Sequence, residues 1–429
     1  MTAMRRHVLF ISPAIPRPAG NGLSMRAWQT LVSLASEYDV HLLAGSRFFP
    51  CTAAELAAAE LPVVSRHLLP VHSWSDPAGM LRRFLLRMGL TRTPSDWLTV
   101  TPAVAGVIRK YVGGKPIELI HIMRLYMWPA AEVAGCVVPG VKRQLDLDDV
   151  ESETRRRLAE LSRTIGDVRA AERFQRDALF LEKQERLVLP CCDRVWVCSG
   201  VDREKLVCRG LGGTVGVVPN TAPLPRACPD PPADGPFTFL FIGSMGYLPN
   251  RDGADFLCRE IVPLLRQMTR RPFRFLIVGR LPPDIRRREW TDVPEVEFLG
   301  GKEDLADCYG DANAVVAPLR AGGGTRIKVL EAFSMARPVV TTPVGVEGIH
   351  ARDGVHVLMG ADAGALARQC VRLMEEPGLA RSLALAARNL YLREYRPEVA
   401  GAAVLENTSI CLSCAVVSRK QDFAPWTIG

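Results

Sequence analysis

Residues 321–349 read AGGGTRIKVLEAFSMARPVVTTPVGVEGI, and this stretch is the most informative part of the chain. Three glycines at 322–324 end a strand-like run and open a helix, and a β-branched strand follows at 338–342. Glycine lets the backbone pass close to a ligand, and the first N–H groups of a helix lack internal partners. Together with the positive end of the helix dipole, they predict an anion site.

The helix that follows the glycines carries three charged residues, Arg326, Lys328 and Glu331. The two cations add positive charge to the predicted anion site. Glu331 lies six residues into the helix, about 9 Å along its axis. This is roughly the reach from a diphosphate to the ribose of the same nucleotide, whose paired hydroxyls suit a carboxylate acceptor. The stretch therefore predicts a nucleotide-diphosphate pocket.

Length and composition indicate a globular protein. The 429 residues suffice for two domains of ordinary size, and 48% are hydrophobic and 23% charged. No run of 18 apolar residues occurs, so a transmembrane helix is not expected. Two arginines precede a short apolar run at 8–12, which fits a core strand better than a signal peptide because prolines follow it. The 12 cysteines show no framework spacing, which favours reduced thiols and a cytoplasmic location.

The formal net charge is +8, with basic clusters at 82–83, 155–157 and 286–288. Such a balance suits nucleic acid, an anionic membrane face or an anionic substrate. No nucleic-acid-binding module accompanies the clusters and no aromatic residues are interleaved with them, so nucleic acid is not expected as a partner. Peripheral contact with the inner face of a membrane stays open.

Short apolar strands alternate with helical stretches along the chain, which predicts α/β domains with parallel sheets. Expected strands are 8–12, 40–44, 119–122, 141–147, 194–198, 216–219, 237–243, 273–279, 296–299, 314–318, 338–342 and 356–359. Residues 219–236 contain seven prolines in 18 residues and cannot form a helix or a central strand. We expect a first domain at 1–218, this linker at 219–236, a second domain at 237–396 and a tail at 397–429.

Residues 151–189 form a long helical stretch with a periodic apolar stripe. One interpretation is a long helix packed on the first domain, and the other is a basic helix that faces a membrane or an acceptor. The stripe consists of Leu158, Leu161, Ile165, Val168, Ala171, Phe174, Ala178 and Leu181. The tail from 405 to 429 allows no assignment beyond packing back on the first domain.

The second half resembles the donor domain of retaining glycosyltransferases of the family-4 type. The resemblance rests on the runs FIGSMGYLPNRDGADFL, FLIVGR and VVAPLRAGGGTRIKVLEAFSMARPVVTTPVGVEGI. It is strong over 237–360 and looser over the first 220 residues, where PAIPRPAGNG and IELIHIMR carry it. It implies the GT-B fold, two Rossmann-like domains with parallel sheets facing across a cleft. VVPNTAPLP and GGGTRIKVLEA are most similar to sugar transferases of bacterial polysaccharide clusters.

Carried over by position, the resemblance implies that Glu331 holds the ribose as the second acid of an E-x7-E motif. Gly323 replaces the first acid, so backbone N–H groups are left to hold phosphate or sugar oxygens. Ser244 stands where an arginine is common, and Asn250 stands where a lysine is expected, with Arg251 beside it. The expected donor-binding residues are Gly20, Gly22, Gly243, Ser244, Gly322, Gly323, Gly324, Thr325 and Glu331. The base is expected near residues 299–302.

The resemblance also implies a catalytic set of Arg251, Lys328, Arg326 and His121. The three cations would neutralise the leaving diphosphate. His121 is placed at the end of a strand, where it would face the sugar; a structural histidine is the alternative, and Arg124 is open to the same two readings. Asp146, Asp148 and Asp149 resemble the metal signature of another glycosyltransferase fold, but we interpret them as loop caps or acceptor contacts and expect no metal.

The sequence thus predicts a metal-independent, hexosyltransferase-like enzyme without a cofactor. It would move a sugar from a nucleoside-diphosphate sugar, of UDP or GDP type, to a glycan, a lipid-linked sugar or a small molecule. Two alternatives stay open. A GT-B sugar-nucleotide epimerase would need acids around the anomeric centre, which Gly323 argues against. A non-catalytic nucleotide-sugar-binding subunit is favoured only by the missing first acid and the unusual tail.

Overall fold

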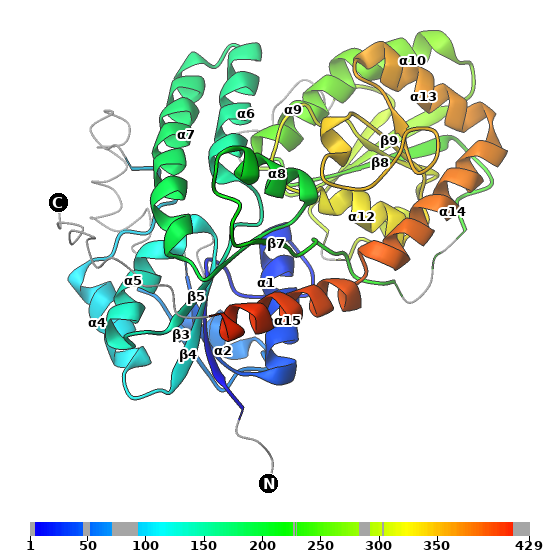
Figure 1. The fold of residues 1–429 in the computed structure, drawn as a ribbon. Helices are drawn as coiled ribbons and strands as arrows, with labels where there is room; N and C mark the ends of the chain where they lie inside the picture. The colour runs from blue at the N-terminus through cyan, green and yellow to red at the C-terminus, as the bar shows by residue number, and fades with distance from the viewer. Residues whose placement is uncertain are drawn as a thin grey trace. The chain divides into compact units, whose positions relative to one another are not determined.

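A computed structural model describes residues 5–45, 52–70, 93–225, 228, 230–282, 292–302 and 304–414 (Figure 1). The chain divides into two compact units, each considered by itself below. The first unit comprises the chain up to Arg156, Glu172–Val218 and the chain from Ala400. The second comprises Arg157–Ala171 and Pro219–Val399. The main change of unit, between Val218 and Pro219, coincides with the start of the proline-rich stretch.

The first unit contains a parallel sheet of seven strands in the order β3-β2-β1-β4-β5-β6-β7. Its central strands are apolar on both faces because helices cover both sides. In β1, for example, Val8 and Phe10 enter one core while Leu9 and Ile11 enter the other. The strands are β1 (His7–Ser12), β2 (Asp39–Ala44), β3 (Ser65–Leu68), β4 (Ile117–Met123), β5 (Lys142–Asp146), β6 (Arg194–Val197) and β7 (Val215–Val217).

Helices connect these strands and shield the sheet from water (Figure 1). The helices are α1 (Gly22–Glu37), α2 (Ala53–Ala58), α4 (Pro102–Val112), α5 (Trp128–Val137), α6 (Glu151–Thr164), α7 (Val168–Val188), α8 (Gly200–Cys208) and α15 (Pro397–Ser413), with 3-10 turns at η1 (Leu125–Met127) and η2 (Leu189–Cys191). The end of α6 from Arg157, the start of α7 up to Ala171 and the first three residues of α15 belong to the second unit.

The second unit contains a parallel sheet of six strands in the order β10-β9-β8-β11-β12-β13. In β8, Phe239 and Phe241 face one core, while Leu240 and Ile242 face the other. The strands are β8 (Phe237–Ile242), β9 (Phe273–Val278), β10 (Val296–Gly300), β11 (Ala314–Ala317), β12 (Val339–Thr341) and β13 (Leu358–Met359). The helices are α9 (Leu248–Phe256), α10 (Val262–Met268), α11 (Ala306–Gly310), α12 (Ile327–Ser334), α13 (Ala363–Glu375) and α14 (Pro377–Glu394), with η3 (Leu257–Ile261) between α9 and α10 and a 3-10 turn at η5 (Val344–Val346).

The prediction of two α/β units with parallel sheets is confirmed, and all twelve expected strands are present within a few residues. Strand β3 was not predicted. It lies at the edge of its sheet, and its four residues are partly or fully exposed, so it lacks the apolar pattern of a core strand.

The prediction of one long helix over 151–189 is wrong, because two helices form there. Gly166 has a φ of 80°, and the Asp167 side chain accepts a hydrogen bond from the backbone N–H of Ala170, which starts α7. Ile165 and Val168, which the apolar stripe placed on a buried face, are exposed at this turn. The Ser152 hydroxyl donates to Glu185 at 2.6 Å, so α6 and α7 run back along each other.

Residues 397–413, for which the sequence indicated no element, form helix α15. Its Val404 and Cys411 are fully buried in the core of the first unit, beside Phe10 and Trp196. The Thr408 hydroxyl accepts a hydrogen bond from Gln144 of β5 at 3.2 Å. The helix is therefore an integral part of the first unit, and residues 415–429 lie outside the described part of the chain.

Candidate functional site

The glycine loop leaves β11 and enters α12 through backbone angles that favour glycine. Gly322 has a φ of 132° and Gly324 a φ of 62°. A residue with a Cβ would be strained at either position. At Gly322 an added Cβ would also meet the Arg326 guanidinium at 3.2 Å. The loop therefore needs glycine both for its curvature and to make room for this arginine.

Arg326 occupies the N-cap position of α12 and is only 8% exposed. Its Nη1 donates to the carbonyl oxygens of Gly323 and Gly324. Its Nε and Nη2 are buried and have no hydrogen-bond partner among the described residues. Burial has removed this guanidinium from water, and two of its N–H groups have no protein hydrogen bond to replace those they would make to water. An anion at this loop would supply the missing hydrogen bonds.

Lys328 lies one residue further along α12, and its amine reaches the neighbouring strand–helix connection. Its Nζ donates to Asn250 Oδ1 at 2.6 Å and lies 4.8 Å from the centre of the Phe241 ring. Burial and, to a smaller extent, the positive charge of Arg326 lower the pKa of Lys328 to about 7, against the opposing effect of Glu331. Near neutral pH the amine is therefore ready to gain a proton when a negative charge arrives.

Glu331 lies three residues beyond Lys328, on the next turn of the same helix. Its Oε2 accepts a hydrogen bond from the Tyr309 hydroxyl at 3.2 Å. Burial raises the pKa of Glu331 to about 7, against the opposing effects of this hydrogen bond and of Lys328. Perturbed groups of both signs on one short helix are typical of a binding or catalytic site.

The loop that follows β8 packs closely against the loop that follows β9. An added Cβ at Gly279 would lie 1.8 Å from the carbonyl oxygen of Gly243, and one at Gly243 would lie 2.5 Å from Cγ of Asn250. Asn250 Nδ2 donates to the backbone oxygen of Ser244 at 3.0 Å. These contacts fix the Asn250 oxygen that holds Lys328. Position 250, where the resemblance expected a cation, thus holds an amide that contacts a cation from α12.

Two further predicted residues lie in the same connection. The Ser244 side chain is exposed, and Arg251 is partly buried on α9. Sequence reasoning did not single out Tyr309 or treat Asn250 as functional, although these residues bind Glu331 and Lys328. No motif marks either of them, because their role depends on which strand ends become neighbours.

The glycines predicted in the first domain form a turn at the carboxyl end of β1. Gly20 is exposed, with a φ of 121° and open space around its Cα. Asn21 caps α1, which begins at Gly22, by accepting a hydrogen bond from the backbone N–H of Ser24 at 2.9 Å. The turn and the helix cap explain why glycine and asparagine occur here. Donor binding by Gly20 and Gly22 stays a prediction.

The expectation that His121 ends a strand is wrong. Strand β4 continues to Met123, and the His121 side chain is fully buried. Its ring lies 4.9 Å from that of Phe10 and 4.8 Å from that of Trp196, and Nδ1 is 3.1 Å from Gln144 Nε2. Burial lowers the pKa of His121 to about 4, so the ring is neutral at physiological pH. This placement favours a structural role.

The acidic residues at the end of β5 and just beyond it are held by two arginines of the first unit, Arg26 and Arg124. Asp146 is fully buried and forms a paired contact with Arg26, with Nη2–Oδ1 at 2.7 Å and Nε–Oδ2 at 2.8 Å. Its Oδ1 also accepts from the backbone N–H of Asp148 at 2.9 Å. Although burial alone would lower the pKa of Arg26, Asp146 and Asp148 raise it. Asp146 is therefore a structural anchor.

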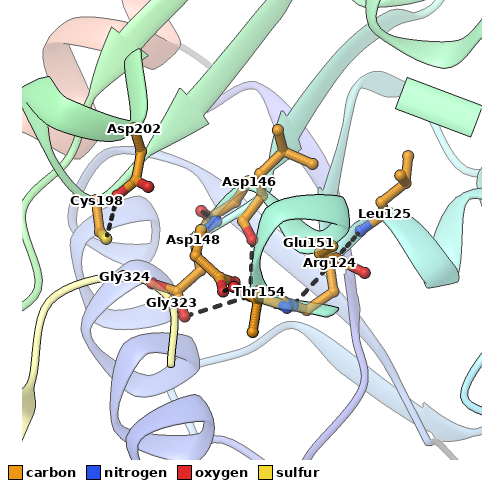
Figure 2. Close-up of polar contacts among 12 residues, drawn as sticks. Arg124, Leu125, Asp146, Asp148, Glu151, Thr154, Cys198, Asp202, Gly323 and Gly324 are labelled. Atoms are coloured by element: carbon orange, nitrogen blue, oxygen red, sulfur yellow. Dashed lines mark hydrogen bonds and ion pairs between the residues drawn. The ribbon is translucent and has the colours of Figure 1, made fainter. Parts of the chain in front are cut away.

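Arg124 lies at the carboxyl end of β4 and holds the other acids (Figure 2). It contacts Asp149 and lies 3.2 Å from Glu151 Oε1 and 3.5 Å from Asp148 Oδ2. Glu151 also accepts from the backbone N–H of Leu125 at 2.8 Å. Burial raises the pKa of Glu151 to about 8 and also raises that of Asp148.

Arg124 and Asp148 have positive φ angles of 72° and 64°. Such strained backbone is found at functional sites. These backbone angles therefore make the carboxyl edge of this sheet a second candidate functional site. Among the described residues, no group of three or more His, Cys, Asp or Glu side chains is placed to hold a metal ion.

Comparison with known proteins finds a family similarity within the second unit. Residues 236–376 match the family model described as glycosyl transferases group 1. This region is therefore similar to group 1 glycosyltransferase domains. A search of curated proteins finds no match.

Solved structures extend the similarity of fold beyond the region that matches the family model. Sucrose-phosphate synthase from Thermosynechococcus elongatus matches with a TM-score of 0.68 at 19% identity, over 95% of this chain and 98% of that one. Anabaena HepE in complex with UDP and glucose matches with a TM-score of 0.64 at 14% identity, over 94% and 99%. A glycosyltransferase from Rickettsia africae matches with a TM-score of 0.62 at 13% identity, over 96% and 100%. Both units therefore have the Rossmann-like architecture of the GT-B fold.

Within the region that matches the family model, the expected base-binding segment, residues 299–302, includes the end of β10 and the two residues after it. Gly300 has a φ of 70°, and its carbonyl accepts the backbone N–H of Gly279 at 2.8 Å. An added Cβ at Gly301 would contact Arg280 at 3.6 Å. The segment thus lies beside the loop that follows β9, at the same carboxyl edge as the glycine loop. Its contact with a base stays a prediction.

Proposed function

We propose that this protein is a retaining glycosyltransferase that transfers a sugar from a nucleoside-diphosphate sugar to an acceptor hydroxyl. The observation that carries the proposal is Arg326, a buried guanidinium with two open N–H donors beside a glycine loop. Lys328 and Glu331 on the same helix provide a second cation and a carboxylate. This combination suits a diphosphate and the ribose attached to it, as proposed from the sequence.

In the proposed reaction the bond between the anomeric carbon and the diphosphate oxygen breaks, and the acceptor oxygen forms a new bond to that carbon. Attack occurs on the face from which the diphosphate leaves, and a phosphate oxygen takes the acceptor proton. Arg326, Lys328 and Arg251 neutralise the charge that develops on the leaving group. Backbone N–H groups of residues 322–325 bind phosphate or sugar oxygens, and Glu331 accepts the ribose hydroxyls. No nucleophile from the protein is required.

The proposal includes catalysis without a metal or a cofactor, since Arg326 and Lys328 supply positive charge at the place where the diphosphate would bind. A nucleotide donor is supported by HepE, whose structures contain UDP or UDP-glucose. A UDP or a GDP sugar is therefore the first donor to test. We propose a glycan, a lipid-linked sugar or a small molecule as acceptor, within polysaccharide biosynthesis. A cytoplasmic location fits the described cysteines, all of which are free.

Thermal-shift measurement against UDP, GDP, ADP and their common sugar conjugates tests the donor site. A nucleotide present at 100 times its Kd should stabilise the folded protein by about 2.7 kcal/mol. Arg326→Gln removes a cation from the glycine loop, and the matched control Arg381→Gln removes one from the exposed surface of α14. Only Arg326→Gln should abolish the thermal shift that the nucleotide causes. If no nucleotide shifts the transition, or if Arg326→Gln leaves the shift unchanged, the proposal fails.

Product analysis separates the alternatives. Free nucleotide with a glycosylated acceptor supports transfer, and NMR of the new anomeric centre tests retention. An epimerised sugar nucleotide without an acceptor product would instead support the epimerase. Binding without hydrolysis or transfer, for every donor that binds, would support a non-catalytic subunit. Loss of activity with a chelator and its recovery with manganese would contradict metal independence.

A further inference from the structure

Helix α7 has one face in the core of the first unit and one face in solvent. Leu181 and Val188 belong to the core, and the Phe180 ring lies 5.0 Å from that of Trp97. The opposite side consists of residues spaced three or four apart, so they lie along one stripe. We call it the outer face of α7, made of Val168, Arg169, Glu172, Arg176, Leu179, Lys183, Arg186 and Leu187, all of which are exposed.

The outer face exposes large apolar side chains. Val168 is 62% exposed, Leu179 58% and Leu187 40%. With Ile165 at the adjacent turn, the α6–α7 segment carries four of the twelve exposed large apolar residues of the described chain. Single exposed leucines are ordinary on protein surfaces. A row of them along one stripe favours an interaction surface.

Cations alternate with these apolar side chains. The outer face carries four basic residues against one acid, Glu172, a balance of +3. Arg186 pairs with Glu182 at 3.2 Å. Arg176 and Lys183 flank Leu179 and form no ion pair with any described residue. At the centre of the stripe, two cations without a salt bridge therefore flank an exposed leucine, and the partly buried Asp177 interacts electrostatically with one of them, Arg176.

We propose that the outer face of α7 docks on an anionic phospholipid surface. The stripe from Val168 to Leu187 is about 28 Å long, so the helix would lie flat on the surface. Cations attract the acidic headgroups, while the apolar side chains enter the boundary between headgroups and acyl chains. An acidic polypeptide would satisfy the cations but would leave the row of exposed apolar residues unexplained. In the described residues, no helix is long and apolar enough to cross a membrane.

Vesicle flotation of the full chain tests this docking without nucleotide or acceptor, so the result does not depend on the proposed glycosyl transfer. We expect binding to vesicles of about 70% phosphatidylcholine and about 30% phosphatidylglycerol. The binding should weaken as salt rises from about 0.1 to about 0.5 M, because the Debye length falls from about 10 Å to roughly half and the charges are screened. Pure phosphatidylcholine should bind poorly. The double variant Arg176→Gln and Lys183→Gln should lose about 25-fold in affinity, because each cation contributes about fivefold. Leu179→Ser should weaken binding without changing its salt dependence.

The chain offers a matched control on α14, where Arg381 is exposed and Leu385 is 60% exposed. The double variant Arg381→Gln and Leu385→Ser should bind vesicles like the unchanged protein. All variants should keep their unfolding temperatures, since each altered side chain is at the surface. The proposal is overturned if the unchanged protein does not float with anionic vesicles, or if the α7 and α14 variants lose binding equally. Binding through α7 to polyglutamate beads but not to vesicles would identify an acidic polypeptide instead.

Discussion

Lys328 allows a direct test of the donor site, because its charge state should change when a diphosphate binds. Burial lowers the pKa of Lys328 to about 7, so at pH 8 its amine carries only about a tenth of a proton. A diphosphate at the glycine loop should restore the proton. Nucleotide binding at pH 8 should therefore take up about 0.9 proton per site. The nucleotide phosphate is already ionised at this pH and contributes nothing.

The same linkage determines how affinity changes with pH. Lys328 is neutral in the free protein and protonated in the proposed complex, so binding includes the free energy of protonating it. This free energy becomes less favourable as pH rises. Affinity should therefore fall about tenfold between pH 8 and pH 9. Glu331, whose pKa is about 7, is already ionised over this interval and does not alter the slope. In Lys328→Met the proton uptake and the slope should both disappear, with weaker binding throughout.

The proton uptake is measured by isothermal titration calorimetry with UDP or GDP in two buffers of different ionisation enthalpy. The weaker complex of Lys328→Met is measured by thermal shift at high nucleotide concentration. The matched control is Arg251→Met, which removes another proposed cation but leaves Lys328 in place, so it should weaken binding and keep the slope. Equal affinity at pH 8 and pH 9, or the same slope in Lys328→Met, would refute the assignment of Lys328 to the diphosphate.

Three further predictions concern single residues. Glu331→Gln should weaken nucleotide binding by about 10- to 100-fold, since a charged hydrogen-bond acceptor is lost. The substitution should also stabilise the free protein above pH 7, where the buried Glu331 is charged and lowers stability. This gain in stability should vanish below pH 4.5, where the carboxyl is protonated in both the folded and the unfolded protein. Gly279→Ala places a Cβ 1.8 Å from the Gly243 carbonyl oxygen and should prevent folding or lower stability by more than about 3 kcal/mol in urea unfolding, whereas Gly246→Ala, whose nearest neighbour is at 3.6 Å, should be nearly neutral. His121→Leu should lower stability but leave kcat/KM within about threefold, and a loss of about 100-fold or more would restore the catalytic role.

Local sequence patterns were sufficient for the order of the strands along the chain and for the glycine loop. A buried parallel strand must be apolar on both faces, so short apolar runs such as 237–242 are visible without any knowledge of their neighbours. Position 322 needs a backbone angle that glycine adopts at no cost, and this requirement also belongs to the residue itself. Elements without such local signals were missed, namely the exposed edge strand β3, the break at Gly166 and helix α15.

The sequence by itself determined that this chain folds into two parallel α/β units and carries a glycine loop followed by a helix with basic and then acidic residues. Only the tertiary structure decided what each charged group meets. Lys328 and Asn250 are 78 positions apart, and Arg26 and Asp146 are 120 apart, yet both pairs are in direct contact. His121 became a core residue for the same reason. Sheet order determines which side chains become neighbours and which lose water, and desolvation sets their charge.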